Sequence, residues 1–115
     1  MAMNYRIVYT QEAEQDIVDI YRYIAFDLRA PEIARSQTYR IMGSIIRLDK
    51  MPLRHQLYQE EPWHSKGLRF LPIDSYLVFY VVQEEDKTVV IIRIMYGKRN
   101  IELQLASDDL TNRTN

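Results

Sequence analysis

The chain has 115 residues, of which 47% are hydrophobic and 27% are charged, as is typical of a single water-soluble globular domain. Its formal net charge of -1 excludes strong global attraction to nucleic acid, so any such contact must depend on a local patch. No apolar run is long enough to cross a membrane, and residues 1–6 lack a signal-peptide pattern. The absence of cysteine excludes disulfides and thiolate metal sites and fits a cytoplasmic protein.

An alternating segment at residues 3–9, MNYRIVY, predicts a strand with Tyr5, Ile7 and Tyr9 on one face. Thr10 can cap the helix that follows, because its hydroxyl can accept a hydrogen bond from a backbone N–H of the first turn. Apolar residues then recur at helical spacing, which predicts one apolar stripe facing the core. The residues of this stripe are Ala13, Ile17, Ile20, Tyr21, Ile24 and Leu28.

A second helix is predicted from Pro31, which suits a first helical position, to a point before Pro52. Gly43 lies inside this helix, where glycine costs about 1 kcal/mol relative to alanine. A closely packed neighbouring helix would explain a glycine at that position. The predicted apolar stripe consists of Ala34, Ile41, Met42, Ile45 and Leu48.

Three strands follow an irregular segment at residues 52–66: GLRFLP (67–72), YLVFYVV (76–82) and TVVIIRIMY (88–96). Polar residues between them predict two hairpins, and the last two strands are apolar on both faces, as expected when both faces are covered. The sequence therefore predicts an α+β fold with an N-terminal strand, a helical hairpin and a three-stranded antiparallel meander in one curled sheet. Residues 1–105 are expected to form one domain and residues 106–115, ASDDLTNRTN, a polar flexible tail.

The last strand ends in YGKRN (96–100), where a tyrosine and a glycine precede two cations. Cations beside aromatic rings suit a phosphate with a stacked base, and metal-free ribonucleases can stabilise their transition state by charge and position alone. The alternative is that these cations end their strands and pair with the many carboxylates. Gly97 frees the backbone next to Arg99. The candidate catalytic residues of this rim are Arg69, Tyr96, Lys98 and Arg99.

Two further groups of residues could carry function. His55 and His64 lie near Glu60 and Glu61 in the irregular segment, and a histidine beside a carboxylate can transfer protons near neutral pH. A solvated or capping histidine is the alternative. Separately, Arg40, Arg47 and Arg54 recur every seven residues, so they could grip a phosphate backbone or an acidic partner. The alternative there is an ordinary solvated helix face.

The sequence lacks a P-loop, a dinucleotide fingerprint, the Gly-x-Ser-x-Gly elbow and the HExxH zinc motif. The two histidines are nine residues apart in an irregular segment, which is no metal-ligand spacing. We therefore expect no cofactor and no metal.

The combination of these segments resembles the RelE/ParE superfamily of bacterial type II toxins. The resemblance rests on the helix AEQDIVDIYRYIAFDL and on the run GLRFLPIDSYLVFYVVQEEDKTVVIIRIMYGKRN, and it extends to about Leu105. The segment EPWHSKGLR (61–69) is similar to a recurring feature of one Gram-positive branch. The resemblance implies two helices packed on a curled sheet, growth arrest by the free toxin, and a companion antitoxin that binds and silences it as a hetero-oligomer. Contacts with target or antitoxin are expected at Arg40, Arg47, Arg54, Trp63 and Arg93.

The resemblance implies two possible mechanisms. RelE-like members cleave mRNA on the ribosome, whereas ParE-like members poison DNA gyrase. Arg99 falls where RelE-like toxins carry a functional arginine, but Leu77 replaces their strand arginine and Leu105 replaces their C-terminal tyrosine. This pattern favours gyrase as the target, with ribosome-dependent mRNA cleavage as the alternative. A third possibility is a non-toxic module that only binds an antitoxin-type partner.

Overall fold

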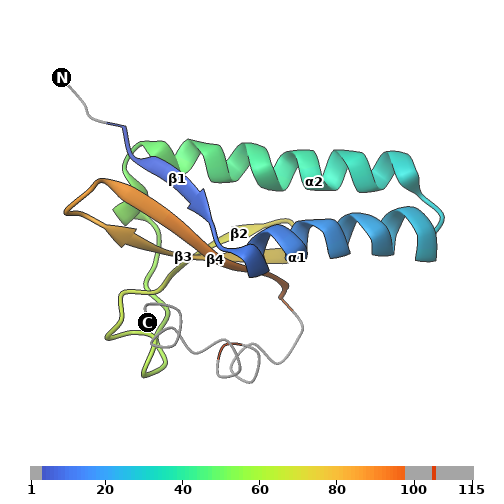
Figure 1. The fold of residues 1–115 in the computed structure, drawn as a ribbon. Coiled ribbons are helices and arrows are strands. Elements are labelled where there is room, and N and C mark those ends of the chain that lie inside the picture. Colours follow the sequence, from blue (N-terminus) through green and yellow to red (C-terminus); the bar gives the residue numbers. More distant parts are fainter. Residues whose placement is uncertain (1–3, 98–104, 106–115) are drawn as a thin grey trace.

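The computed structural model describes residues 4–97 and Leu105 (Figure 1). Its elements are β1 (Arg6–Tyr9), α1 (Gln11–Arg22) continued by a π-helical turn (Tyr23–Asp27), α2 (Pro31–Ile46), short 3-10 turns at Arg47–Asp49 and Pro52–Arg54, β2 (Arg69–Ile73), β3 (Tyr76–Gln83) and β4 (Thr88–Tyr96). This order confirms the predicted strand, helical hairpin and three further strands. The predicted tail lies outside the described residues. None of the helices in the described part of the chain has the length and apolar character needed to span a bilayer.

The four strands form one sheet in the order β1-β4-β3-β2. Strands β2, β3 and β4 pair antiparallel, so the predicted meander is confirmed. Strand β1 instead pairs parallel to β4, with Arg6 opposite Thr88 and Tyr9 opposite Ile91, and the sheet is therefore mixed. Parallel neighbours need a long connection, and here the helical hairpin and the meander together supply it.

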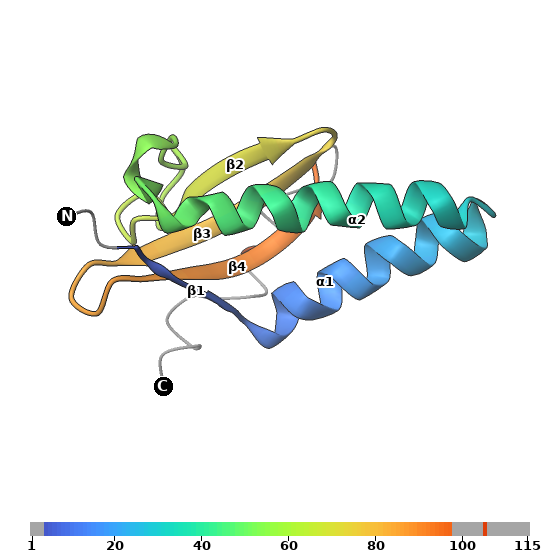
Figure 2. The ribbon, with the colours of Figure 1, turned by 90° about the horizontal axis from the view of Figure 1, so that it is seen from above.

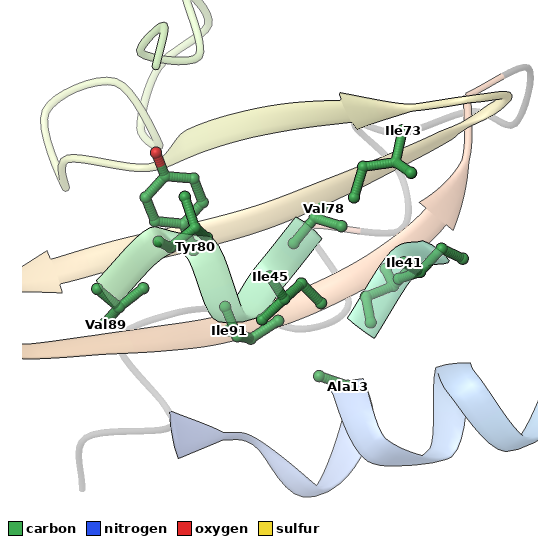
Figure 3. Packing of buried hydrophobic residues seen from close by; sticks show 10 residues of the cluster. Ala13, Ile41, Ile45, Ile73, Val78, Tyr80, Val89 and Ile91 are labelled. Atoms are coloured by element: carbon green, nitrogen blue, oxygen red, sulfur yellow. The ribbon is translucent and has the colours of Figure 1, made fainter. Parts of the chain in front are cut away.

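The helical hairpin covers one face of the sheet, as the two views in Figures 1 and 2 show. Ile41 and Ile45 of α2 are completely buried and pack with Val78 of β3 and Ile91 of β4 (Figure 3). Ala13 brings α1 into the same cluster. Burying an aliphatic side chain of this size contributes about 1.5 to 3 kcal/mol, so this layer holds the hairpin in place.

The opposite face of the sheet is covered by the segment between α2 and β2, seen below the sheet in Figure 1. A second buried cluster lies there, and Tyr58 contacts the rings of Trp63, Phe70 and Phe79 edge-on within it. Strands β3 and β4 are therefore covered on both faces, as their apolar sequences predict. The buried members of this cluster are Trp63, Leu68, Phe79, Ile92, Met95 and Leu105.

The same segment protects the outer edge of β2. The Tyr58 N–H donates to the Leu68 carbonyl at 2.8 Å, and the Phe70 N–H donates to the Gln56 carbonyl at 3.1 Å. An edge strand with unpaired backbone groups is a template for aggregation, and these bonds satisfy the first half of β2. Pro72, which has no N–H to offer, lies in the second half.

Thr10 joins α1 to the sheet. Its Oγ1 accepts a hydrogen bond from the Ala13 N–H at 3.0 Å, which confirms the predicted helix cap. The same hydroxyl donates to the Ile92 carbonyl at 2.9 Å, and the Thr10 N–H donates to the Ile91 carbonyl at 3.0 Å. The start of α1 is therefore fixed against β4.

Three details of the helices differ from prediction. Leu28 is 56% exposed because the π-helical turn at Tyr23–Asp27 adds a residue to one turn and rotates the end of the stripe away from the core. Met42 is 41% exposed because the buried positions of α2 are its neighbours Ile41 and Ile45. A Cβ built on Gly43 would meet no atom within 4 Å, so close packing of a neighbouring helix does not explain this glycine.

Candidate functional site

A groove of about 700 Å³ lies between the far end of the helical hairpin and the ends of β3 and β4 that carry Tyr76 and Tyr96. The α1 side contributes both carboxylates and apolar side chains, whereas the strands contribute tyrosines and one arginine. Apolar side chains at its rim are exposed to solvent, notably Tyr23, Leu28 and Ile33. The groove is lined by Asp16, Asp19, Ile20, Tyr23, Ile24, Leu28, Ile33, Gln37, Ser75, Tyr76, Arg93, Ile94, Met95 and Tyr96.

An ion pair between α1 and β4 lies in this groove. Arg93 Nε donates to Asp16 Oδ2 at 2.7 Å and Arg93 Nη2 donates to Asp16 Oδ1 at 2.9 Å. The Ile94 N–H adds a third bond to Asp16 Oδ2 at 2.8 Å. Both side chains are largely buried, with 14% of Arg93 and 11% of Asp16 exposed. Arg93 therefore holds α1 on β4 and presents a neutralised charge to the groove.

A β-bulge directs Arg93 toward α1. The pairing of β3 with β4 runs regularly from Tyr76 opposite Tyr96 to Phe79 opposite Arg93, and then shifts so that Tyr80 lies opposite Ile91. One residue of β4, Ile92, is left out of the pairing. Bulges bend a strand and re-aim its side chains. In this sheet the bulge adjoins the one arginine of β4.

Tyr96 forms the rim of the groove at the end of β4. Its ring packs edge-on against Tyr76, with centroids 5.7 Å apart. The Gly97 N–H donates to the Ser75 carbonyl at 2.8 Å, and a Cβ on Gly97 would lie only 3.3 Å from that oxygen. The glycine therefore permits a close backbone approach. Lys98 and Arg99, which follow it, lie outside the described residues.

Arg69 lies at the end of β2 that is remote from the groove, because it pairs with Tyr80 in the middle of β3, whereas Ile73 at the other end of β2 pairs with Tyr76. Its Nη1 donates to the His55 carbonyl at 2.7 Å, and the His55 ring packs edge-on against Tyr80 at 6.4 Å. The Tyr80 hydroxyl donates to the Pro52 carbonyl at 2.6 Å, and burial raises the pKa of Tyr80 to about 12. We call Arg54, His55 and Arg69 the basic junction.

The pKa of His55 lies below its ordinary range. Burial is the larger cause, and the positive charges of Arg54 and Arg69 add to it. The imidazole is therefore held in its neutral form at neutral pH, while the two guanidinium groups beside it stay charged. The basic junction combines two permanent cations with a neutral donor and acceptor.

Trp63 and His64 are adjacent in sequence but have different surroundings. Trp63 is buried in the second cluster, so it stabilises the segment under the sheet. His64 is partly exposed, and its Nδ1 lies 3.6 Å from Glu61 Oε2. The hydroxyl and N–H of Ser65 both donate to Glu61 and lower its pKa, with His64 contributing less. This turn provides a histidine–carboxylate pair at the surface, well ordered by Ser65.

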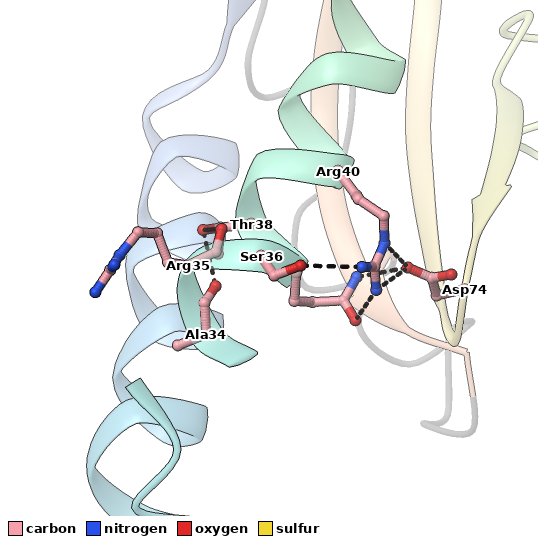
Figure 4. Close-up of polar contacts among 7 residues, drawn as sticks. Ala34, Arg35, Ser36, Thr38, Arg40 and Asp74 are labelled. Carbon is pink, nitrogen blue, oxygen red and sulfur yellow. Dashed lines mark hydrogen bonds and ion pairs between the residues drawn. The ribbon is translucent and has the colours of Figure 1, made fainter. Parts of the chain in front are cut away.

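The three arginines spaced by seven residues do not continue along one helix. Arg40 lies on α2 and pairs with Asp74 at 3.0 Å, supported by Ser36 and Gln37 (Figure 4). Helix α2 ends at Ile46, so Arg47 and Arg54 fall in separate 3-10 turns. All three remain exposed. Hydrogen bonds from Gln37 and Arg40 hold the pKa of Asp74 below its ordinary range.

The described residues contain no group of three or more histidine, cysteine, aspartate or glutamate side chains placed to hold a metal ion. A family model described as "ParE toxin of type II toxin-antitoxin system, parDE" matches residues 7–101. The chain belongs to the ParE toxin family.

Solved structures share the fold of this ParE-family toxin. It is similar to a chain of the chromosomal ParDE toxin–antitoxin system from P. aeruginosa, with a TM-score of 0.70 and 21% identity over 84% of this chain and 100% of that one. The free E. coli RelE toxin mutant matches with a TM-score of 0.64 and 12% identity, over 96% and 98%. A chain of the toxin-antitoxin complex RelBE2 from Mycobacterium tuberculosis matches with a TM-score of 0.59 and 21% identity, over 84% of this chain and 94% of that one. A sequence search of curated proteins gives no match.

The predicted site residues of the ParE-family toxin fall into separate places. Tyr96 and Arg93 share the groove, whereas Arg69 and Arg54 share the basic junction at the end of β2 remote from the groove. One functional candidate, Asp16, was missed from sequence. An arginine inside an otherwise apolar strand signals a buried carboxylate partner, and Asp16 lies next to Ile17 of the apolar stripe, so this residue could have been found.

Proposed function

We propose that this ParE-family toxin arrests growth by acting on DNA gyrase and that a cognate antitoxin keeps it silent in the cytoplasm. The observation that carries the choice of target is the packing of two leucines. Leu105 is 1% exposed and lies in the second cluster, and Leu77 packs against the same cluster. The resemblance implies a tyrosine and an arginine at these positions in the ribonuclease branch.

Those two leucines bear on chemistry because a catalytic side chain must reach its substrate. A buried aliphatic side chain neither transfers a proton nor binds a phosphate. A polar side chain at the same buried position would lose its hydration, which is unfavourable. Where the resemblance implies catalytic side chains for the ribonuclease branch, this toxin has the buried Leu105 and the partly buried Leu77. Arg93, which lies on the last strand, is already paired with Asp16.

The groove suits the antitoxin as a protein partner. It offers exposed apolar side chains at its rim, while its arginine has its charge already balanced by a carboxylate of the same chain. Amphipathic helices dock in such grooves through apolar side chains spaced by three and four residues. We propose that an apolar face of the antitoxin fills the groove between α1, α2 and Tyr96.

Two parallel assays test the proposed target. Purified toxin is added to gyrase in a DNA supercoiling and cleavage assay, and reporter mRNA from induced cells is mapped by primer extension. The proposal predicts inhibited supercoiling or trapped DNA cleavage with intact mRNA. Codon-positioned mRNA cuts with unaffected gyrase would establish the ribonuclease alternative instead. Normal growth of cells that express the toxin without its antitoxin would reject both and leave a binding module.

A further inference from the structure

Arg69 on β2 and Arg93 on β4 are two arginines of the sheet that differ in how their charge is balanced. The guanidinium of Arg93 is held by both oxygens of Asp16. The guanidinium of Arg69 has a backbone carbonyl, that of His55, as its hydrogen-bond acceptor. Within residues 4–97 and Leu105, no carboxylate lies within ion-pair distance of Arg69. Arg69 is therefore a partly desolvated cation without a counter-charge among these described residues.

A single carbonyl leaves most of the Arg69 guanidinium unused. An arginine carries five N–H donors in a planar fork, and this fork matches the two oxygens of a carboxylate or phosphate. Removing a cation from water is unfavourable unless an anion or several acceptors replace the water. An anionic group from outside the chain would complete the coordination that Asp16 completes for Arg93.

Arg54 and His55 add to the same positive region. Arg54 is exposed at the end of the 3-10 turn, and it too lacks a carboxylate partner among the described residues. Arg54 and Arg69 both act on the His55 imidazole, which shows that the three groups share one electrostatic environment. The bond from Tyr80 to the Pro52 carbonyl fixes the turn that carries Arg54 and His55. The basic junction is thus assembled before any ligand arrives.

The neighbourhood of the basic junction favours a protein ligand over a nucleic acid. Met51 and Leu53, on the same turn as Arg54, are exposed apolar side chains. Apolar groups beside cations complement a segment that carries both carboxylates and apolar side chains. A nucleic-acid backbone is instead attracted by extended positive charge, and this chain has a net charge of -1.

We propose that the basic junction is a binding site for a carboxylate side chain in an acidic, partly apolar segment of a protein partner. Arg69 takes the carboxylate in a forked contact, Arg54 adds a second charge, and His55 donates or accepts at its side. This site goes beyond the proposed function, because it lies at the end of β2 remote from the groove, and none of its residues lines the groove. It does not depend on which target the toxin has.

A titration on the purified full-length toxin tests this site. The probes are a peptide of alternating glutamate and leucine, the same peptide with glutamine in place of glutamate, and a single-stranded DNA oligonucleotide of equal charge. NMR follows the ring protons of His55. The glutamate peptide should shift these resonances saturably and raise the pKa of His55, because a bound anion favours the imidazolium form. The glutamine peptide should leave them unchanged.

Charge variants locate the site. Arg69→Gln should weaken the glutamate peptide roughly tenfold or more, since it removes a forked charge-assisted contact. Arg69→Lys, which keeps the charge but not the fork, should weaken it less. Arg40→Gln is the matched control, because Arg40 is an exposed arginine already paired with Asp74. An equal loss in Arg40→Gln, stronger binding of the oligonucleotide, or no saturable shift in wild type would each overturn the proposal.

Discussion

Asp16 and Arg93 form a forked ion pair that joins α1 to β4, with the two nitrogen–oxygen distances at 2.7 and 2.9 Å. The pair lies between the hydrophobic core and the groove, so it serves both stability and the shape of the site. Removing one member of a largely buried pair leaves the other charge without compensation, which costs about 3 to 5 kcal/mol.

Asp16→Asn should therefore lower the free energy of unfolding by roughly 3 kcal/mol or more, as measured by urea denaturation. Asp19→Asn is the matched control, because Asp19 is an exposed carboxylate on the same helix and should change stability little. The double variant Asp16→Ala, Arg93→Met should recover part of the loss. A single Asp16→Asn variant as stable as wild type would show that the pair contributes little.

Thr10→Ala should destabilise the toxin by about 1 kcal/mol, because the first turn of α1 loses its side-chain cap. The variant also loses the bond to the Ile92 carbonyl, so the effect should fall at or above that value. Thr10→Ser keeps the hydroxyl and serves as the control. Equal stability of the alanine and serine variants in thermal unfolding would argue against the cap as the stabilising contact.

Gly43→Ala should stabilise the toxin by about 1 kcal/mol, because the added methyl meets open space and alanine has the higher helix propensity. Gly67→Ala provides the contrast, since φ is +78° there and alanine in that conformation costs roughly 1 kcal/mol. Urea midpoints of the two variants should move in opposite directions. A destabilised Gly43→Ala would contradict the prediction that the added methyl group meets open space.

Stability should fall when the pH is lowered through about 6.5, the ordinary pKa of histidine. The pKa of His55 is lowered in the folded chain, so the unfolded chain binds the extra proton and the free energy of unfolding decreases on acidification. His55→Gln should remove this slope, and Arg54→Gln should reduce it. The carboxyl groups of Glu61 and Asp74, whose pKa values are also lowered, act nearer pH 4 and can be separated. Urea midpoints measured across this pH range give the slope of stability against pH. An unchanged slope in His55→Gln would show that a group other than His55 causes it.

Ile33→Asp should weaken binding of the antitoxin by roughly tenfold or more without unfolding the toxin, because Ile33 lines the groove and is 63% exposed. Tyr39→Asp is the matched control, since Tyr39 lies on the same helix, is 77% exposed and does not line the groove. Calorimetry with the purified antitoxin measures both affinities. An equal effect of the two substitutions would show that the antitoxin binds the outer face of α2 and not the groove.

The arrangement of elements could be predicted because hydrophobic period and turn residues are local signals. Strands β3 and β4 are apolar on both faces, which predicted that both faces of the sheet are covered. Thr10 indicated the start of α1. The exposure of Leu28 could not be predicted, since a π-helical turn shifts the helical phase without a mark in the sequence. The parallel pairing of β1 with β4 depends on contacts between distant segments, which no local pattern encodes.

The site was harder to predict than the fold for a similar reason. Sequence singled out Arg69 and Tyr96 together. The strand register instead places Tyr96 beside Tyr76, at the end of β2 opposite to Arg69. The β-bulge that aims Arg93 at Asp16 adds one residue to β4 and leaves no distinctive composition. Residue types pointed to cationic and aromatic side chains, whereas grouping these side chains required the strand register.

The parallel pairing of β1 with β4 also has a consequence for synthesis. Arg6 and Thr88 are neighbours in the sheet, although 82 residues separate them along the chain. Closing such a long loop is slow because of its entropic cost. The pairing of β1 with β4 can stabilise the chain only after β4 has been synthesised. A nascent toxin therefore has neither its edge strand in place nor its groove complete, because β4 contributes to both. A partner that binds in this groove can therefore do so only after β4 has been synthesised.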